Sequence, residues 1–162
     1  MSQRVPVPAH IAALNLLDRV DYEDAFTVRS SVPQSAEQWA RLALEGAPPA
    51  LRGFILGAHR ALGLRLASPK SPDHVLGWEI LQSEPDLLLL GTEGHILTPR
   101  IVLSTPPGRV VAATLIRFDR VGARAVWAVV APIHRGVARY LLDRTAKRRR
   151  SGALGSKGSN VA

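Results

Sequence analysis

The strongest pattern of apolar positions lies near the end of the chain, over residues 125–142. Apolar side chains recur there at spacings of three and four residues, which is the period of a helix with one buried face. The longest run without a charge or a histidine, residues 125–133, is far shorter than the roughly 20 residues that span a bilayer. We therefore expect a core helix, bent at Pro132 because proline removes a backbone hydrogen bond. Its buried stripe is predicted to consist of Val126, Val129, Val130, Ile133, Val137, Tyr140 and Leu141, opposite Arg124, Arg135 and Arg139.

The chain before this helix predicts a strand, two short helices and then a run of strands. Residues 21–30 alternate apolar and polar side chains, as a half-buried strand does. A helix that Gln34 or Ser35 caps, with Trp39, Leu42 and Ala43 as its apolar stripe, is expected to end at Gly46. A second helix is expected from Pro49 to Gly63. Four short apolar runs then fill residues 74–120, each bounded by a turn signal, and they predict antiparallel strands joined by hairpins.

This order of elements predicts one α+β domain. A sheet with an apolar face and a helix with an apolar stripe both need a partner, and a curved antiparallel sheet wrapped around the C-terminal helix satisfies both. We expect this domain over residues 21–149. Residues 1–20 are expected to form an N-terminal extension, and residues 150–162 a basic, glycine- and serine-rich tail that is disordered.

Four segments resemble a known family: DYEDAFTVR, EQWARLALEGAPPALRGF, ALGLRL and FDRVGARAVWAVVAPIHRGVARYLL. They are similar to a bacterial family of the START-like (SRPBCC) superfamily, which includes polyketide cyclases and lipid-transfer domains. The resemblance spans about Asp21 to Arg148, and its most specific part runs from Gly122 to Arg135. The family more often has asparagine near Asp119 and tyrosine or another aromatic near Val126 or Trp127. The resemblance implies the helix-grip fold and an internal cavity, and it implies no catalytic residues.

Composition and charge narrow the classes of function. The 162 residues are 46% hydrophobic, enough for one domain with a core, and the absence of cysteine excludes disulfides, thiolate metal sites and thiol nucleophiles. The N-terminus has no signal-peptide core, so we expect a cytoplasmic protein. Of 21 lysines and arginines, seven lie from Arg139 onward against one acid, so that segment holds +6 of the formal charge of +8.

The basic end of the helix balances the helix dipole, and the alternative is a weak contact of the tail with an anionic surface. No stacking aromatics accompany the charges, so nucleic acid is not an expected partner. Glu93 and His95 share a strand face without further ligands, and we expect neither a metal nor a cofactor. The sequence predicts no oligomeric state.

Candidate ligand-binding residues lie on the predicted strands and on the C-terminal helix. The alternation of Phe118 with Arg117 predicts that the Phe118 face looks inward, while Pro99 indicates a bulge or an edge position in the preceding strand. His134 is either a structural histidine at the Pro132 bend or a polar group in a cavity. Arg100 either lies on the surface or holds a ligand carboxylate. The predicted ligand contacts are His134, Trp127, Phe118, Arg100 and Trp78, although each tryptophan also suits the core.

Three hypotheses for the function follow. The leading one is binding of a small, mainly hydrophobic ligand between the antiparallel sheet and the C-terminal helix. The second is a cyclase- or hydratase-like enzyme that uses His134 as acid or base in the same cavity. The third is a ligand-free interaction module whose interior is filled by side chains. No nucleophile elbow and no glycine-rich phosphate loop after a strand supports a more specific activity.

Overall fold

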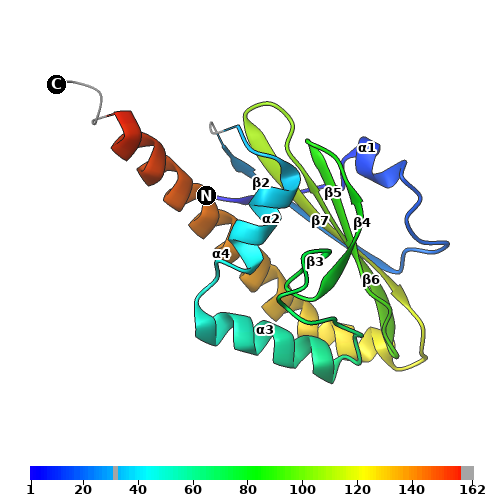
Figure 1. Cartoon of the computed structure of the whole chain (residues 1–162). Helices are drawn as coiled ribbons and strands as arrows, with labels where there is room; N and C mark the ends of the chain where they lie inside the picture. Colours follow the sequence, from blue (N-terminus) through cyan, green and yellow to red (C-terminus); the bar gives the residue numbers. More distant parts are fainter. Residues whose placement is uncertain (31–32, 158–162) are drawn as a thin grey trace.

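An antiparallel sheet organises the part of the chain that the computed structural model describes, residues 1–30 and 33–157 (Figure 1). Its strands are β1 (Gln3–Val5), β2 (Tyr22–Arg29), β3 (His74–Val75), β4 (Trp78–Ser83), β5 (Leu87–Gly91), β6 (Leu97–Ser104) and β7 (Arg109–Phe118). They lie in the order β1-β2-β7-β6-β5-β4-β3. The helices are α1 (Ala9–Ala12), α2 (Ala36–Leu44), α3 (Pro49–Ala61) and α4 (Ala123–Lys157). The α+β class is therefore confirmed, and so is the element order from β2 onward.

Strands β3 to β7 form the predicted meander, in which each strand pairs with the next. The first apolar run contains two strands rather than one, because Leu76 and Gly77 both adopt positive φ and turn the chain between β3 and β4. β2 pairs with β7 from Tyr22, opposite Ile116, to Arg29, opposite Arg109. This pairing places the first predicted strand beside the last, at the opposite end of the meander from β3.

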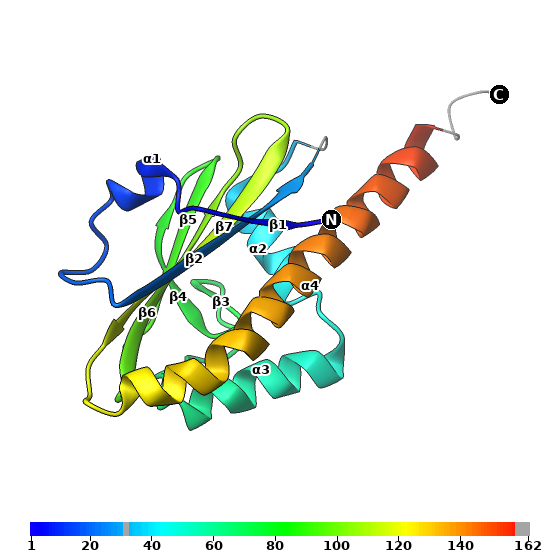
Figure 2. The same cartoon turned by 180° about the vertical axis from the view of Figure 1, so that it is seen from behind.

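Alternating side chains divide the sheet into two apolar faces. On one face Phe26, Leu90 and Ile116 pack with α2, α3 and α4. On the other face Ala113 and its neighbours pack with Ile11 of α1. Figures 1 and 2 show α1 on the opposite side of the sheet from α3 and α4. Residues 1–20 were predicted as an extension, but they contribute the edge strand β1 and cover the second face of the sheet.

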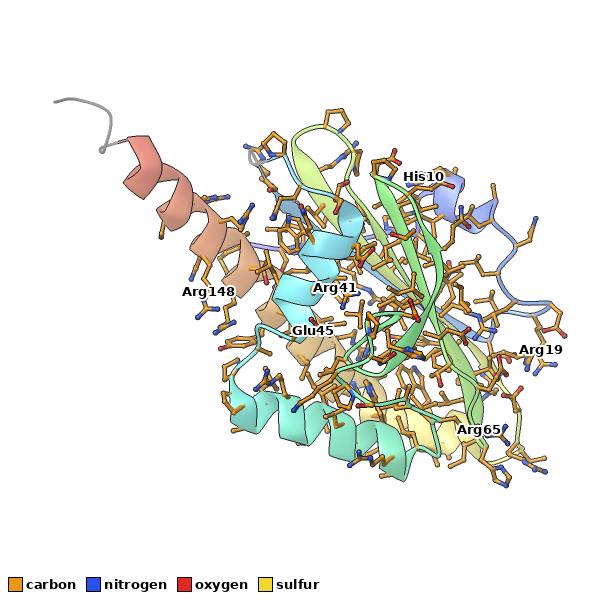
Figure 3. The ribbon with its side chains drawn as sticks, in the orientation of Figure 1. His10, Arg19, Arg41, Glu45, Arg65 and Arg148 are labelled. Carbon is orange, nitrogen blue, oxygen red and sulfur yellow. The ribbon has the colours of Figure 1, made fainter. Side chains whose placement is uncertain are left out.

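Local sequence signals fix α2 and its place against the sheet. Ser35 caps the helix, and its hydroxyl and the Gln38 side chain form a reciprocal capping box. The buried stripe consists of Ala36, Trp39, Ala40 and Ala43, while Leu42, predicted to belong to it, is exposed. Arg41 pairs with Glu45 at 3.1 Å and donates to the backbone oxygens of Pro72 and His74 (Figure 3). Arg41 therefore ties α2 to the chain segment that enters β3.

The C-terminal helix packs with a different face inward from the one that its strongest hydrophobic residues predict. Trp127, Ala131, Leu141, Leu142 and Ala146 are buried, whereas Val126, Val129, Ile133 and Tyr140 are exposed. The predicted stripe is therefore wrong in its phase by about a third of a turn. Of its members, Leu141 is buried as predicted, and Val130 and Val137 are partly buried. The small side chains of the alanines let α4 approach α2 and β2 closely, and the indole of Trp127 fills the space beside them.

The change of direction in α4 agrees with the predicted bend, whereas the length of the helix differs from the prediction. Pro132 lies inside a continuous helix, and Figure 2 shows the helix changing direction after its first turns. The helix continues to Lys157, past residue 150 where the tail was predicted to begin, and residues 158–162 of that tail lie outside the described part. Among the described residues, no helix combines the length and the apolar character needed to cross a membrane.

Pro99 lies in β6, between β5 and β7, and not in an edge strand. It pairs opposite Ile116 of β7 without a break in register, so it forms no bulge in that pairing. The other neighbour, β5, ends at Gly91, opposite Arg100. Pro99 therefore occupies the first position of β6 that β5 no longer covers, and the missing N–H leaves no ladder hydrogen bond unmade on that side.

Candidate functional site

A cavity of about 170 Å³ lies between the sheet, α3 and α4. The floor of the cavity consists of inward-facing side chains of β6 and β7: Leu97, Pro99, Ile101, Leu103, Ala112, Thr114 and Ile116. The walls come from α2, α3 with its C-cap, and α4, and they include Ala43, Ile55, Ala58, Leu62, Val130, Val137, Ala138 and Leu141. Phe54 of α3 and Ile133 of α4 line the cavity and are still 51% and 52% exposed. The opening of the cavity is therefore between these two helices.

The structure brings together three of the five predicted ligand contacts. His134, Trp127 and Trp78 all line the cavity, as do Ala112, Thr114 and Ile116 of the predicted inward face of β7. Phe118 lies on that face beyond the cavity, and the guanidinium of Arg124 is 5.9 Å from its ring centre. Arg100 lies on the other face of β6, where it pairs with Glu93 at 2.9 Å and donates to the backbone oxygen of Thr92. Neither Phe118 nor Arg100 reaches the cavity.

A buried polar cluster adjoins the cavity on the β2 side. The hydroxyl of Tyr22 donates to Oδ2 of Asp24 at 2.6 Å, and Nε2 of His134 is 3.5 Å from the same oxygen. Nη1 of Arg135 donates to the Tyr22 hydroxyl at 3.4 Å. The ring of Trp127 lies edge-on to Tyr22, with centres 5.1 Å apart, and 5.4 Å from the ring of His134. The cluster therefore joins a carboxylate, a phenol and an imidazole beside an apolar cavity.

Asp24 is ionised in this cluster although only 3% of the residue is exposed. Burial on its own raises the pKa of Asp24, but the adjacent His134 and the Tyr22 hydroxyl favour the carboxylate more strongly, so this pKa lies below its ordinary value. Burial and the neighbouring carboxylate raise the pKa of Tyr22, which keeps the phenol protonated as a donor. The second carboxylate oxygen, Oδ1 of Asp24, is buried without a hydrogen-bond partner.

A second histidine, His59 of α3, also lines the cavity. Its ring packs edge-on to Trp78, with centres 5.2 Å apart, and its Nδ1 is buried without a partner. Burial, and to a smaller extent the positive charge that His134 can take, lower the pKa of His59 to about 4. His59 is therefore neutral at physiological pH, and it behaves as part of the apolar wall.

Sequence reasoning missed Tyr22, Asp24 and His59 as site residues, although a signal existed for each. Tyr22 and Asp24 are four and two residues before Phe26 on one strand, so they share its inward face. His59 follows Ile55 by four residues on the buried side of α3. Comparisons of the sequence with protein-family models and curated proteins, and of the fold with solved structures, found no match. The site is therefore interpreted from its own chemistry.

Proposed function

We propose that the protein binds a small, mainly apolar ligand in the cavity between the sheet, α3 and α4. The observation that supports this proposal is the cavity itself, about 170 Å³ in volume with an apolar lining and an opening to solvent. A buried cavity of about 150 Å³ with a similar lining is enough to hold benzene. The expected ligand is therefore no larger than one ring or a short branched chain in its buried part.

The arrangement of the elements supports the same proposal. β2, the meander and the terminal helix follow the order that the START-like resemblance implies, and the cavity lies between the sheet and α4, where that resemblance implies an internal cavity. The cavity also speaks against the ligand-free interaction module, because packed interiors contain few voids larger than a water molecule. Binding inside the fold thus remains the function that the geometry favours.

A pair of substitutions on α4 tests the proposal. Ala138 lines the cavity, while Ala128 lies on the exposed side of the same helix. Ala138→Leu places extra methyl groups in the cavity, and Ala128→Leu adds the same groups to the surface. We expect toluene to raise the melting temperature of the wild type and of Ala128→Leu, because a ligand present at 100 times its Kd adds about 2.7 kcal/mol of stability.

The toluene concentration that gives half of the maximal stabilisation should be at least tenfold higher for Ala138→Leu than for the wild type. Mass spectrometry of solvent extracts from the purified full-length wild type should in addition detect a small apolar compound that the Ala138→Leu protein lacks. Equal toluene affinity in the two leucine variants, or no effect of toluene on the wild type, would refute binding in this cavity.

A further inference from the structure

Binding of an apolar ligand does not explain why the Asp24 carboxylate is buried beside the cavity. Moving an ionised carboxylate out of water is unfavourable unless hydrogen bonds and a counter-charge compensate for the lost hydration. Asp24 has one such hydrogen bond, from Tyr22, and Oδ1 has no partner. An apolar residue at this inward position of β2 would pack beside Phe26 without that penalty. A purely structural role therefore gives no reason for a carboxylate at this position.

Asp24 does have an effect on His134. Nε2 of His134 is buried 3.5 Å from the Asp24 carboxylate, and His134 also lines the cavity. A carboxylate beside one ring nitrogen favours the tautomer with the proton on that nitrogen. The lone pair is then on Nδ1, the other ring nitrogen. His134 is therefore prepared to accept a proton from a molecule in the cavity.

The groups around His134 keep this proton equilibrium local. Asp24 and Tyr22 face it from β2, His59 faces it from α3, and Arg135 follows it on α4. His59 stays neutral at physiological pH, and the Tyr22 phenol stays protonated. The charge next to the imidazole is thus the Asp24 carboxylate, which stabilises the imidazolium that forms when His134 takes up a proton.

We propose that the cavity is a proton-transfer site in which His134 is the acid–base catalyst and Asp24 is its positioning residue. This inference rests on the proposed ligand-binding function. In the step, a C–H bond next to a carbonyl breaks and its proton goes to Nδ1 of His134. The electron pair forms the C=C bond of an enolate as the carbonyl π pair moves to oxygen. The imidazolium then returns a proton to the same or another carbon, so the net reaction is exchange or isomerisation without any co-reactant.

The lining of the cavity indicates a neutral carbonyl compound as the substrate class. No lysine or arginine is among the described residues that line it, so a phosphate or a carboxylate would be buried there without a counter-charge. Thr114 of β7 lines the cavity, and its hydroxyl has the chemistry to donate to a carbonyl oxygen. The volume of about 170 Å³ limits the substrate to a small ketone or enone.

Deuterium exchange into cyclohexanone tests this inference with the full chain. The ketone is incubated with protein in D₂O, loss of the α-proton signal is followed by NMR, and binding is measured in parallel by thermal shift. We expect the wild type to accelerate exchange over buffer. His134→Gln should lower the protein-dependent rate about 10²- to 10⁴-fold, the range that a general acid–base contributes, and should retain cyclohexanone binding. His95→Gln, an exposed histidine outside the cavity, is the matched control and should exchange at the wild-type rate.

The Asp24→Asn variant distinguishes a role of Asp24 in positioning His134 from a role in stabilising the fold alone. Its exchange rate should fall, and the midpoint of its pH–rate profile should move to lower pH, because the imidazolium loses its counter-ion; a purely structural change would lower the rate without moving that midpoint. If Asp24→Asn does not fold, Tyr22→Phe, which removes one hydrogen bond to the same carboxylate, takes its place with a smaller shift. Binding without exchange, or exchange unaffected in His134→Gln, overturns the catalytic inference and leaves ligand binding standing. No binding of cyclohexanone or toluene to the wild type overturns both.

Discussion

His59 should make the stability of the protein fall between pH 6.5 and pH 4. Burial lowers the pKa of His59 from its ordinary value of 6.5 to about 4, so the folded protein resists the proton that the unfolded chain accepts. The contribution of neutral His59 to the free energy of unfolding is fully present above pH 6.5. It is lost as the pH falls toward the pKa of His59 in the folded protein. Each tenfold change in proton affinity is worth about 1.4 kcal/mol, which gives a loss of about 2 kcal/mol by pH 5 and about 3 kcal/mol by pH 4.

The assay is urea unfolding followed by tryptophan fluorescence at pH 7.5 and pH 5. His59→Leu keeps an apolar side chain of similar volume beside Trp78 and removes the titration. The difference in unfolding free energy between the two pH values should therefore be about 2 kcal/mol smaller in His59→Leu than in the wild type. His95→Leu, at an exposed position, should retain the wild-type difference. Parallel pH dependence in the wild type and His59→Leu would show that His59 is solvated, and would refute its placement in the cavity wall.

Three further substitutions test the local arguments by the same unfolding assay. Ser35→Ala removes the capping box of α2 and should lower the free energy of unfolding by about 1 kcal/mol, with no change in toluene affinity. Gly77→Ala places a Cβ 2.8 Å from the Ala67 oxygen at a φ of +86° and should destabilise by about 1–3 kcal/mol, whereas Gly57→Ala, in open space on α3, should stabilise by about 0.5–1 kcal/mol. Arg100→Met should leave toluene affinity unchanged, because Arg100 lies on the far face of β6; a weaker affinity would place it at the ligand after all.

The helices and strands were predictable where one side of the element is polar and the other is apolar. Residues 22–29 alternate clearly, and they form β2 as expected. Ser35, Pro49 and Gly63 mark helix boundaries by backbone chemistry that needs no tertiary partner, and all three lie at or next to the observed helix ends. The small strand β1 was not predictable, because the three residues before Pro6 are too few to show a period and exist as a strand through pairing with β2.

The face of α4 could not be predicted because residues 125–133, most of its first three turns, are apolar on all sides. Residues 125–133 contain no charge, so hydrophobic period alone leaves the rotation of the helix open. Valine and isoleucine outweigh alanine in such a pattern, and they moved the predicted stripe toward Val129 and Ile133. In the structure, close approach to α2 and β2 selects the alanine side instead. The same rotation turns His134 toward the buried face, where 22% of its side chain is exposed.

The rotation of α4 also explains why only some of the site residues could be predicted from the sequence. His134, Trp127 and Trp78 were predicted from their residue types, but Asp24 becomes a partner of His134 only when α4 lies across β2 with this face inward. The pairing of β2 with β7 places Tyr22 and Asp24 beside the strand that forms the cavity floor. A contact across 110 residues of sequence depends on both events, and no local pattern encodes it.

Unpaired polar atoms gather at the cavity, which favours a functional reason for them. Among the described residues, eight buried side-chain nitrogens and oxygens have no hydrogen-bond partner, and five of them belong to Asp24, His59, Trp78, Trp127 and His134. Each unsatisfied buried group costs about 1–3 kcal/mol, so a fold optimised only for stability would disperse or remove them. Four of these five residues line the cavity, and the fifth, Asp24, adjoins one of the four. After small side-chain rotations, a bound molecule with acceptor and donor atoms would form hydrogen bonds with such groups. The free energy that these unpaired groups cost the empty protein would then be recovered on binding.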